Sequence, residues 1–350
     1  MKIISIVGAR PQFIKLGPLS REIRKNYDEI IIHTGQHFDD NMSKLFFNDL
    51  NIPEPNYYCD INGGDHGEQT GRMLIEVEKI FRKENPDLAV VFGDTNSTLA
   101  GSLVAAKLGV KTVHIEAGLR SFNRAMPEEI NRIISDHISD FLFAPTRTAV
   151  NNLTKEGLSD KTFFSGDIMV DSIVYAKNLI KEKNIKSKFS NYYLVTLHRP
   201  YNVDNPQNLN KILERLAKLD RNIVFPVHPR TRKIIIDNGI RINANIKVLE
   251  PVGYLEFISL ELNAKKIITD SGGIQKEAYI LKRPCLTLRS ETEWVETVDS
   301  GWNTLIDVYN DNFNNIITTF QPPLVHENLF GQNVAAKMIE QINKLYKKGS

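Results

Sequence analysis

The sequence predicts an α/β protein made of two Rossmann-like, doubly wound domains that face each other across a cleft. The chain has 350 residues, long enough for two domains of roughly 100 to 200 residues each. Short runs rich in Ile and Val recur, and each is followed by a glycine or polar turn and then by a stretch with helical spacing. A charged segment with few large apolar residues interrupts this alternation near the middle of the chain, which indicates two halves.

The first half contains short apolar runs of the kind that a parallel sheet buries on both faces. The expected strands are IISIV (3–7), EIIIH (29–33), LAVVF (88–92), TVHIE (112–116) and FLFA (141–144). A helix is expected over 96–107 because a Thr/Asn/Ser turn precedes it. Thr95 and Ser97 are therefore interpreted first as helix caps.

The second half repeats the pattern and begins after a linker. Its expected strands are YYLVTL (192–197), NIVFPV (222–227), IKVLE (246–250), KIIT (266–269) and CLTL (285–288). Pro206 predicts the start of a helix over 206–219. The charged stretch KEKNIKSKFSN (181–191) places a linker near 165–190. We therefore expect domains at 1–170 and 171–350, with a last helix that could pack back on the N-terminal domain.

The composition favours small-molecule chemistry. The 44 basic and 42 acidic residues nearly balance without blocks of like charge, so neither a nucleic-acid partner nor a membrane patch is indicated. Cys59 and Cys285 lie far apart without metal-site spacing, which favours reduced thiols in an intracellular protein. The apolar run at the N-terminus has about five residues, too few for a signal peptide or for a membrane span of ~20. We expect a cytoplasmic protein.

Polar and ionisable residues follow nearly every expected strand. Ligands of open parallel sheets bind outside the carboxyl ends of the strands. These positions hold Arg10, Lys15, Gln36, His37, Asp94 and Glu116 in the first half, and His198, Arg199, His228, Arg230, 270–278 and 289–296 in the second. One such residue is weak support, since His33 or His114 could simply be hydrogen-bonded in the core. Together they indicate a binding site in each half.

The segment DSGGIQKEA (270–278) predicts a diphosphate site. Gly272 and Gly273 would let a ligand approach the backbone, and the following helix offers N–H groups and a positive dipole to an anion. The segment is neither a P-loop nor a GxGxxG fingerprint, which disfavours a nucleotide triphosphatase and a dinucleotide dehydrogenase. Glu277, one turn into the helix, could bind ribose hydroxyls or could serve only as a charge that suits the helix dipole.

Asp94, Glu116 and Glu128 are the candidate acid and base groups. Neighbouring carboxylates in a partly desolvated cleft push their proton affinities apart, which suits proton transfer. Clustered carboxylates can also bind a metal, but no compact ligand pattern such as HExxH is present, so a metal is not indicated. Glu129, next to Glu128, is interpreted as a helix-start charge.

Together these segments resemble the non-hydrolysing UDP-N-acetylglucosamine 2-epimerases. The matching motifs are GARPQFIK, HTGQH, GDTNST, HIEAGLR, MPEEINR, HPRT, TDSGGIQKEA and RSETEWVE, spread over nearly the whole chain. The resemblance implies a glycosyltransferase-B type fold, UDP held mainly by the C-terminal domain, a homodimer, and no redox cofactor. It also implies interconversion of UDP-GlcNAc and UDP-ManNAc by UDP elimination and re-addition through a 2-acetamidoglucal, for surface polysaccharide precursors.

The resemblance also assigns roles to residues. Asp94, Glu116 and Glu128 match the family's catalytic carboxylates, and His198 matches a catalytic or diphosphate-contacting histidine. Lys15 matches a basic residue of the active-site loop. The UDP-binding positions are matched by Arg10, His228, Ser271, Gly272, Gly273 and Glu277.

Two departures from the family pattern bear on the substrate and on regulation. QHFD (36–39) stands where the allosteric site of many bacterial members has QHRQ, which weakens the expectation of allosteric activation although Gln36, His37 and Arg72 still match. GARPQFIK, HRPYN and RSFNRAMPEEINR resemble a branch that includes epimerases of UDP-2,3-diacetamido-glucuronic acid. The extra sugar carboxylate would favour a spare cation. Arg120 and Arg124 are available, and Arg120 is shared with ordinary members.

Three alternatives to the lead substrate and activity stay open. The first is the same C2 epimerisation on the diacetamido-uronic sugar nucleotide. The second is a glycosyltransferase with the same fold, since fold does not fix function. The third is a UDP-sugar sensor without turnover, which the intact Asp94, Glu116 and Glu128 disfavour.

Overall fold

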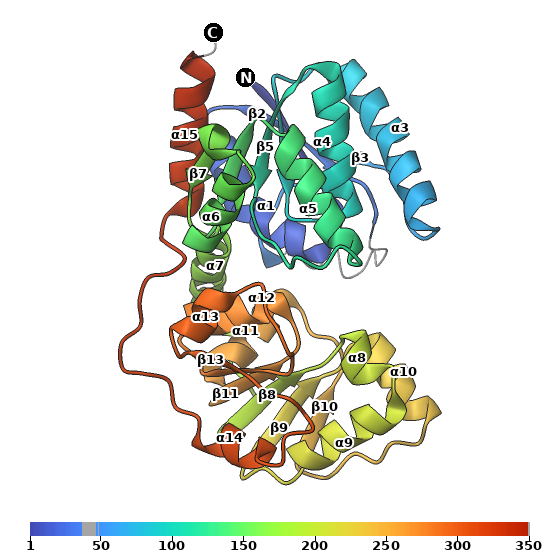
Figure 1. The fold of residues 1–350 in the computed structure, drawn as a ribbon, viewed down its shortest axis with the longest axis vertical. Helices are drawn as coiled ribbons and strands as arrows, with labels where there is room; N and C mark the ends of the chain where they lie inside the picture. Colours follow the sequence, from blue (N-terminus) through green and yellow to red (C-terminus); the bar gives the residue numbers. More distant parts are fainter. Residues whose placement is uncertain (37–46, 48, 349–350) are drawn as a thin grey trace. The chain divides into compact units, whose positions relative to one another are not determined.

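The computed structural model describes residues 1–36, 47 and 49–348 as two compact units (Figure 1). Unit 1 comprises Met1–Tyr175 and Leu329–Ser350, and unit 2 comprises Ala176–Asn328. Each unit is a parallel β-sheet with helices packed on it. The predicted α/β class, with one doubly wound sheet in each half, is confirmed.

Unit 1 alternates strands and helices along most of its length. Its elements are β1 (Lys2–Val7), α1 (Arg10–Ile23), β2 (Asp28–His33), β3 (Tyr57–Tyr58), α3 (His66–Glu84), β4 (Leu88–Phe92), α4 (Asn96–Leu108), β5 (Lys111–Ile115), α5 (Pro127–Ile138), β6 (Phe141–Ala144), α6 (Arg147–Lys155), a 3-10 helix at Ser159–Lys161, β7 (Thr162–Phe164), the start of α7 (Met169–Glu182) and α15 (Val334–Lys348).

The sheet of unit 1 has the order β3-β2-β1-β4-β5-β6-β7 among the described residues, and every pair is parallel. The order 3-2-1-4-5-6 is that of the Rossmann fold, and β7 extends it by one strand. All five expected strands are present. β3 and β7, which were not predicted, are two and three residues long at opposite edges of the sheet.

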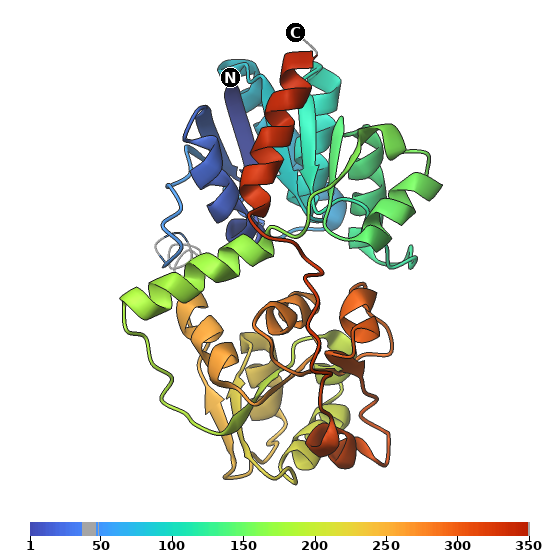
Figure 2. The same cartoon turned by 90° about the vertical axis from the view of Figure 1, so that its left-hand side faces the viewer.

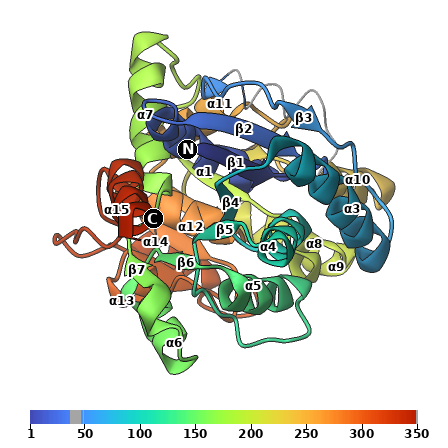
Figure 3. The same ribbon diagram turned by 90° about the horizontal axis from the view of Figure 1, so that it is seen from above.

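Helices cover both faces of this sheet. Figure 3 shows α3, α4 and α5 on one side, and α1 with α15 on the other. The apolar side chains between the sheet and its helices form a core that includes Ile4, Ile6, Val91 and Val104. Figure 2 shows α15, drawn in red, lying across the face of the sheet beside α1. The Tyr27 hydroxyl donates a hydrogen bond to the side-chain oxygen of Asn343, which ties α15 to the segment after α1.

Unit 2 is built around a second parallel sheet, which shares no strand with that of unit 1. Its elements are the end of α7, β8 (Tyr192–Thr196), α8 (Pro200–Val203), α9 (Pro206–Leu216), β9 (Asn222–Pro226), α10 (Pro229–Asp237), β10 (Ile246–Leu249), α11 (Tyr254–Asn263), β11 (Lys266–Thr269), α12 (Gly272–Ile280), β12 (Cys285–Thr287), α13 (Val295–Asp299), β13 (Asn303–Leu305) and α14 (Phe313–Thr319).

The strands of unit 2 run in the order β10-β9-β8-β11-β12-β13, all parallel, which is again the Rossmann order. The central strands β8 and β11 are buried along their whole length, as expected for strands covered on both faces. Two apolar clusters, one on each side of the sheet, include Leu213 and Phe225 in one and Tyr192 and Leu260 in the other. β13, which was not predicted, has three residues.

The N-termini of α4 and α9 show the contacts behind the two helix starts that were predicted from the sequence. Thr95 caps α4 by accepting a hydrogen bond from Thr98 N at 3.3 Å, as predicted. Ser97 does not cap this helix; it lies inside the first turn. α9 begins at Pro206, and the side chain of Asn205 accepts hydrogen bonds at its N-terminus.

The expected linker near 165–190 is mostly a helix. α7 occupies Met169–Glu182 and crosses the boundary between the units at Tyr175. Its first half packs on α1, where Ser172 Oγ donates to Ile14 O at 2.6 Å. The composition of 181–191 indicated a boundary, but the apolar spacing of MVDSIVYAKNLI (169–180) specifies a helix right up to it.

We expect Gly166→Ala to destabilise unit 1 more than Gly157→Ala. Both glycines have a left-handed backbone, with φ of +81° and +78°. That conformation costs an alanine about 1–2 kcal/mol at either site. A Cβ on Gly166 would also lie 2.6 Å from Phe330 O, where the chain re-enters unit 1, whereas a Cβ on Gly157 would meet nothing within 4 Å.

Differential scanning calorimetry of the two variants measures this difference in the transition of unit 1. Equal shifts in melting temperature would contradict the close packing of the re-entering segment on Gly166.

Candidate active site

The candidate site of unit 1 lies at the carboxyl end of its sheet. β1 and β4 are neighbours there, but the chain leaves them in opposite directions, to β2 and to β5. Such a point is where ligands bind in open parallel sheets. Arg10 begins α1 after β1, Asp94 follows β4 and Glu116 follows β5, so the sheet brings these predicted residues to one edge.

Close packing at this edge requires glycine after β1. A Cβ on Gly8 would lie 2.1 Å from Thr34 Oγ1 and 2.2 Å from Ser97 Oγ, which are themselves 2.8 Å apart. Gln36 Oε1 accepts hydrogen bonds from Ser97 N at 3.0 Å and from Ser97 Oγ at 2.7 Å. Gln36 was expected as a sugar or allosteric contact, and its side-chain oxygen is hydrogen-bonded to Ser97 in the first turn of α4. His37 lies outside the described residues.

Gln12 organises the turn before α1 and was not singled out from the sequence. Its Oε1 accepts from Gly8 N at 2.7 Å and from Ala9 N at 3.0 Å, and its Nε2 donates to Phe92 O at 2.8 Å. The side chain thus joins the ends of β1 and β4. A glutamine at the third position of a helix is a known capping signal that could have identified it.

Glu116 adopts a left-handed backbone conformation, with φ of +71°. The strand expected over 112–116 therefore ends one residue early, at Ile115. The Glu116 carboxylate forms an ion pair with the ammonium of Lys15 on α1, and the two side chains are only 12% and 7% exposed. Left-handed conformations in residues other than glycine are uncommon and often occur at functional sites.

Arg132 on α5 links Asp94 to Glu129. Its Nη2 is 2.6 Å from Asp94 Oδ2, and its Nη1 is 2.7 Å from Glu129 Oε2. Burial alone would lower the pKa of Arg132, but the two carboxylates outweigh it and raise the pKa above its ordinary value. Arg132 therefore stays charged beside Asp94. It is a functional candidate that was missed from the sequence, although it ends the motif MPEEINR.

Glu128 and Glu129, consecutive on α5, occupy opposite environments. Glu128 is exposed, whereas Glu129 is buried and accepts hydrogen bonds from Ser121 N at 3.0 Å and Phe122 N at 2.9 Å. Burial would raise the pKa of Glu129, but these hydrogen bonds and Arg132 hold it below its ordinary value. Glu129 thus anchors the loop before α5, which is more than the helix-start charge expected of it.

The two loop arginines also differ. Arg124 is exposed. The Arg120 side chain is 1% exposed, and its guanidinium pairs with Asp136 at 2.8 Å and with Glu156 at 2.7 Å. Arg120, expected as a sugar or allosteric contact, is therefore occupied inside unit 1. Arg72, the other expected allosteric contact, donates to Asn62 O at 3.0 Å near the start of α3.

The candidate site of unit 2 centres on His198 and Asp270. Asp270, which is fully buried after β11, accepts hydrogen bonds from His198 N at 3.1 Å, Arg199 N at 3.0 Å and Asn202 Nδ2 at 3.1 Å. Its Oδ1 is 3.2 Å from His198 Nδ1. Burial would raise the pKa of Asp270, but His198 holds it below its ordinary value. An ionised Asp270 therefore orients the imidazole, as the aspartate of a catalytic triad does.

Ser271, Gly272 and Gly273 form the start of α12, as predicted. A Cβ on Gly273 would have only Ser271 Oγ at 4.0 Å, so the backbone there is open to a ligand. A Cβ on Gly272 would lie 2.2 Å from Glu293 Oε1, so this glycine instead makes room for the Glu293 side chain. Glu293 pairs with Arg289 at 2.9 Å.

Glu277 and His228 complete the predicted set in unit 2. Glu277, on α12, is 6% exposed and lies against the fully buried Glu261 of α11. Burial and then the charge of Glu277 raise the pKa of Glu261 well above its ordinary value, which favours the protonated form of Glu261. His228 caps α10, and its ring centre is 6.2 Å from that of His198.

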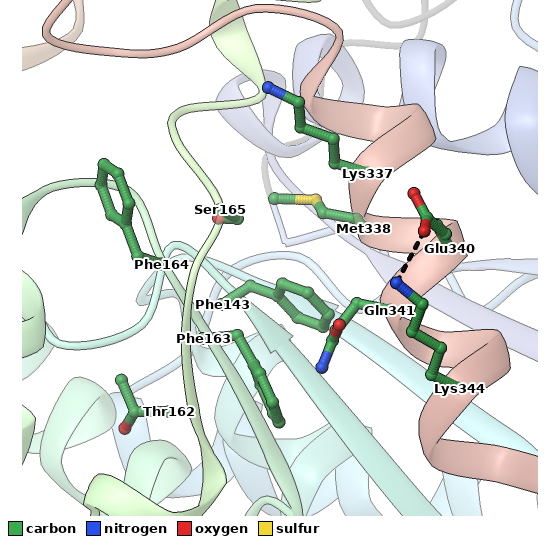
Figure 4. Close-up of a pocket in the computed structure, with 10 residues that line it drawn as sticks. All are labelled: Phe143, Thr162, Phe163, Phe164, Ser165, Lys337, Met338, Glu340, Gln341 and Lys344. Atoms are coloured by element: carbon green, nitrogen blue, oxygen red, sulfur yellow. Dashed lines mark ion pairs between the residues drawn. The ribbon is translucent and has the colours of Figure 1, made fainter.

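A cavity of about 380 Å³ lies elsewhere, at the edge of the unit 1 sheet (Figure 4). It is lined by Phe143 of β6, residues of β7 including Phe163, and residues of α15 including Met338 and Lys344. None of the predicted site residues lines it, so the cavity does not define the candidate active site.

Two features are absent from the described residues. No group of three or more His, Cys, Asp or Glu side chains in residues 1–36, 47 and 49–348 is arranged to hold a metal ion. Within the same part of the chain, no helix is both long enough and apolar enough to cross a membrane.

Comparison with known proteins gives consistent matches. The model of the family described as UDP-N-acetylglucosamine 2-epimerase matches residues 21–344. A UDP-N-acetylglucosamine 2-epimerase homolog from Methanococcus maripaludis is 52% identical, with 99% of this chain and 100% of the relative aligned. A UDP-2,3-diacetamido-2,3-dideoxy-D-glucuronate 2-epimerase from Pseudomonas aeruginosa is 49% identical, with 89% and 90% aligned.

Solved structures extend the likeness to the fold. The crystal structure of the Methanocaldococcus jannaschii UDP-GlcNAc 2-epimerase in complex with UDP-GlcNAc and UDP has a TM-score of 0.89 and 45% identity, covering 99% of this chain and 100% of that one. The calicheamicin glycosyltransferase CalG4, at 11% identity and a TM-score of 0.55, shares the fold, which is the predicted glycosyltransferase-B type. With the family model matching most of its length, the chain belongs to the UDP-N-acetylglucosamine 2-epimerase family.

Proposed function

We propose that this protein is an isomerase that interconverts UDP-GlcNAc and UDP-ManNAc without hydrolysing them. The observation that carries the proposal is the M. jannaschii enzyme, 45% identical over 99% of this chain, whose crystal structure is described as a complex with UDP-GlcNAc and UDP. The charged residues at the carboxyl ends of both sheets support it, because they suit a reaction that moves a proton and releases a diphosphate.

The reaction takes place in two steps that mirror each other. A base removes the proton on C2 while the bond from C1 to the UDP oxygen breaks with its electron pair, which gives 2-acetamidoglucal and UDP. UDP then adds back to C1 while an acid delivers a proton to the opposite face of C2. The chemistry therefore needs proton-transfer groups around C2 and positive charge near the departing diphosphate.

We assign the proton transfers to residues of unit 1. Glu116 and Asp94 are held by separate cations, Lys15 and Arg132, so each carboxylate has a fixed orientation. Glu128 is the third candidate, and its exposed position leaves it accessible to a substrate.

We assign UDP binding mainly to residues of unit 2. His198, oriented by Asp270, is placed to contact the diphosphate or to transfer a proton. The open backbone at Gly273 and the N-terminus of α12 offer N–H groups to phosphate oxygens. Ser271, His228 and Arg10 are further candidates for the diphosphate. Glu277 would accept hydrogen bonds from ribose hydroxyls.

Three further proposals rest on the resemblance to the family alone. We propose that the protein acts as a homodimer, that it is cytoplasmic, and that its product is used for surface polysaccharide precursors. A sedimentation-velocity measurement tests the first of these directly.

A second candidate substrate is UDP-2,3-diacetamido-glucuronic acid. It is favoured by the 49% identity to the P. aeruginosa enzyme named for that sugar and by Arg124, an exposed cation in the loop before α5. The chemistry at C2 would be unchanged. Only the group that recognises the sugar carboxylate would differ.

Glu116→Gln is expected to lower the exchange of the C2 proton with solvent deuterium by about 10²–10⁴-fold, because the amide cannot accept that proton. Proton NMR of UDP-GlcNAc incubated in D₂O measures the exchange and the appearance of UDP-ManNAc together. Glu76→Gln, which changes a surface glutamate paired with Lys79, is the matched control.

Three results would count against the proposal. Full exchange in Glu116→Gln would remove Glu116 from proton transfer. Release of free ManNAc by the wild-type protein would indicate a hydrolysing enzyme. Binding of UDP-GlcNAc without any exchange would indicate a sensor.

Arg132→Met should lower kcat by about 10²-fold, because Asp94 loses the cation that orients it. Arg132→Lys should recover part of the rate, since an ammonium restores the charge but not the two-pronged geometry. The control is Arg82→Met, which removes an exposed arginine paired with Glu78 on α3. If Arg132→Met lowers the melting temperature but leaves kcat intact, Arg132 has a structural role only.

Arg124→Gln separates the two candidate substrates. If the uronic sugar is the substrate, losing a charged hydrogen bond to its carboxylate should raise KM by about 10- to 100-fold. UDP-GlcNAc turnover should be unaffected by the same change. Steady-state assays of both compounds with the wild type, Arg124→Gln and the surface control Lys107→Gln give the comparison. If the wild type turns over the uronic compound and leaves UDP-GlcNAc unchanged, the uronic compound is the substrate in place of UDP-GlcNAc.

A further inference from the structure

A cluster of buried polar and charged side chains, made of His114, Asp136 and Arg120, lies inside unit 1, and the half-buried Glu156 pairs with Arg120 at its edge. His114 on β5 and Asp136 on α5 have no exposed surface, and the Arg120 side chain has almost none. The predicted catalytic residues are not members of this cluster. Burying such charges costs free energy of solvation, and well-packed apolar residues in their place often stabilise a protein at least as much. The cost of burying the cluster therefore indicates a role other than stability.

His114 bridges two acceptors. Its Nδ1 is 2.7 Å from Asp136 Oδ1, and its Nε2 is 2.7 Å from Gly93 O. A carbonyl oxygen can only accept, so Nε2 must carry a hydrogen. Burial would raise the pKa of Asp136, but His114 and then Arg120 hold it below its ordinary value. His114 therefore connects Asp136 of α5 to the turn that follows β4.

The second carboxylate oxygen of Asp136 contacts the turn that contains Gly118. Oδ2 accepts a hydrogen bond from Gly118 N at 3.1 Å and pairs with Arg120 Nη1 at 2.8 Å. Gly118 has φ of +82°, and a Cβ there would lie 2.5 Å from Ala149 O, so the turn has little freedom to move. Asn152 Nδ2 holds the carbonyl of the same glycine at 3.0 Å.

The two backbone groups held in this way flank the predicted catalytic carboxylates. Gly93 directly precedes Asp94, and Gly118 follows Glu116 by two residues. A chain of hydrogen bonds therefore runs from the Asp94 turn through His114 and Asp136 to the Glu116 turn. Gly93 N also donates to Ile115 O at 2.9 Å, which makes a second link between the same turns.

We propose that His114 and Asp136 are positioning residues that fix the Asp94 turn relative to the Glu116 turn. They touch no substrate themselves. The proposal rests on the proposed epimerase function for its effect on rate, because both turns carry the groups assigned to proton transfer. Small displacements of such groups are costly, since about 1 Å can lower a rate by about 10²-fold.

Asp136→Asn and His114→Asn test the effect on rate. Each should lower kcat by about 10²-fold while KM stays within about twofold, because substrate-binding groups are untouched. In His114→Asn the amide nitrogen can replace Nδ1 toward Asp136 but cannot reach Gly93. Unchanged kcat in both variants would overturn the proposal.

Asp140→Asn is the matched control. Asp140 lies at the other end of β5, where it pairs with Lys111 at 2.8 Å and accepts from Thr112 N at 2.9 Å. Its replacement removes a charged contact at the start of β5, whereas the Asp94 and Glu116 turns follow the carboxyl ends of β4 and β5. Loss of kcat in Asp140→Asn equal to that in Asp136→Asn, with equal loss of melting temperature, would mean that the cluster only stabilises unit 1.

Two measurements do not depend on the enzyme's activity. NMR of wild-type protein labelled with ¹⁵N-histidine should show an exchange-protected Nε2–H signal that vanishes in His114→Asn; absence of that signal from the wild type would overturn the bridge. Hydrogen exchange at Gly118 N should be faster in Asp136→Asn than in Asp140→Asn, and equal rates would count against it. If the wild type fails to epimerise any UDP-sugar, the proposed function falls, while these measurements still decide the role of the cluster.

Discussion

The parallel register of the unit 1 sheet is the constraint on which the candidate site depends. Phe92 lies opposite Ile115, and Ile6 lies opposite Val91, so β1, β4 and β5 end within a few residues of one another. The residues that follow them therefore emerge at one edge, whatever their distance along the chain. Glu116 shows the consequence, since its first partner is Lys15 from α1, about a hundred residues earlier in the sequence.

Buried carboxylates are held in two ways. In unit 1 Glu129 pairs with Arg132 and Asp136 pairs with Arg120, and the pKa values of these two carboxyl groups are lowered. In unit 2 Glu261 meets a second carboxylate in full burial, and its pKa is raised. The first arrangement keeps groups ionised and oriented. The second favours the protonated form of the inner carboxyl group, Glu261.

The sequence was sufficient for features that depend on local pattern. Every long strand was predicted from its apolar run, and the start of α9 was predicted from Pro206. β3, β7 and β13 were missed because two or three residues are too few to show a period. Arg132 and Asp136 were missed for another reason. Their importance comes from partners on other elements, Asp94 and His114, which no spacing along the chain reveals.

The return of the chain to unit 1 has a consequence for how the protein is made. α15 covers a face of the first sheet, yet Val334–Lys348 leaves the ribosome after the whole of unit 2. All the residues of unit 2 are synthesised before it, so unit 2 is complete as a folding unit while unit 1 still lacks a helix. The apolar side chains of Met338 and Ile342, buried in the folded protein, cover unit 1 only after unit 2 has been synthesised. The unit whose synthesis begins before the other is completed after it.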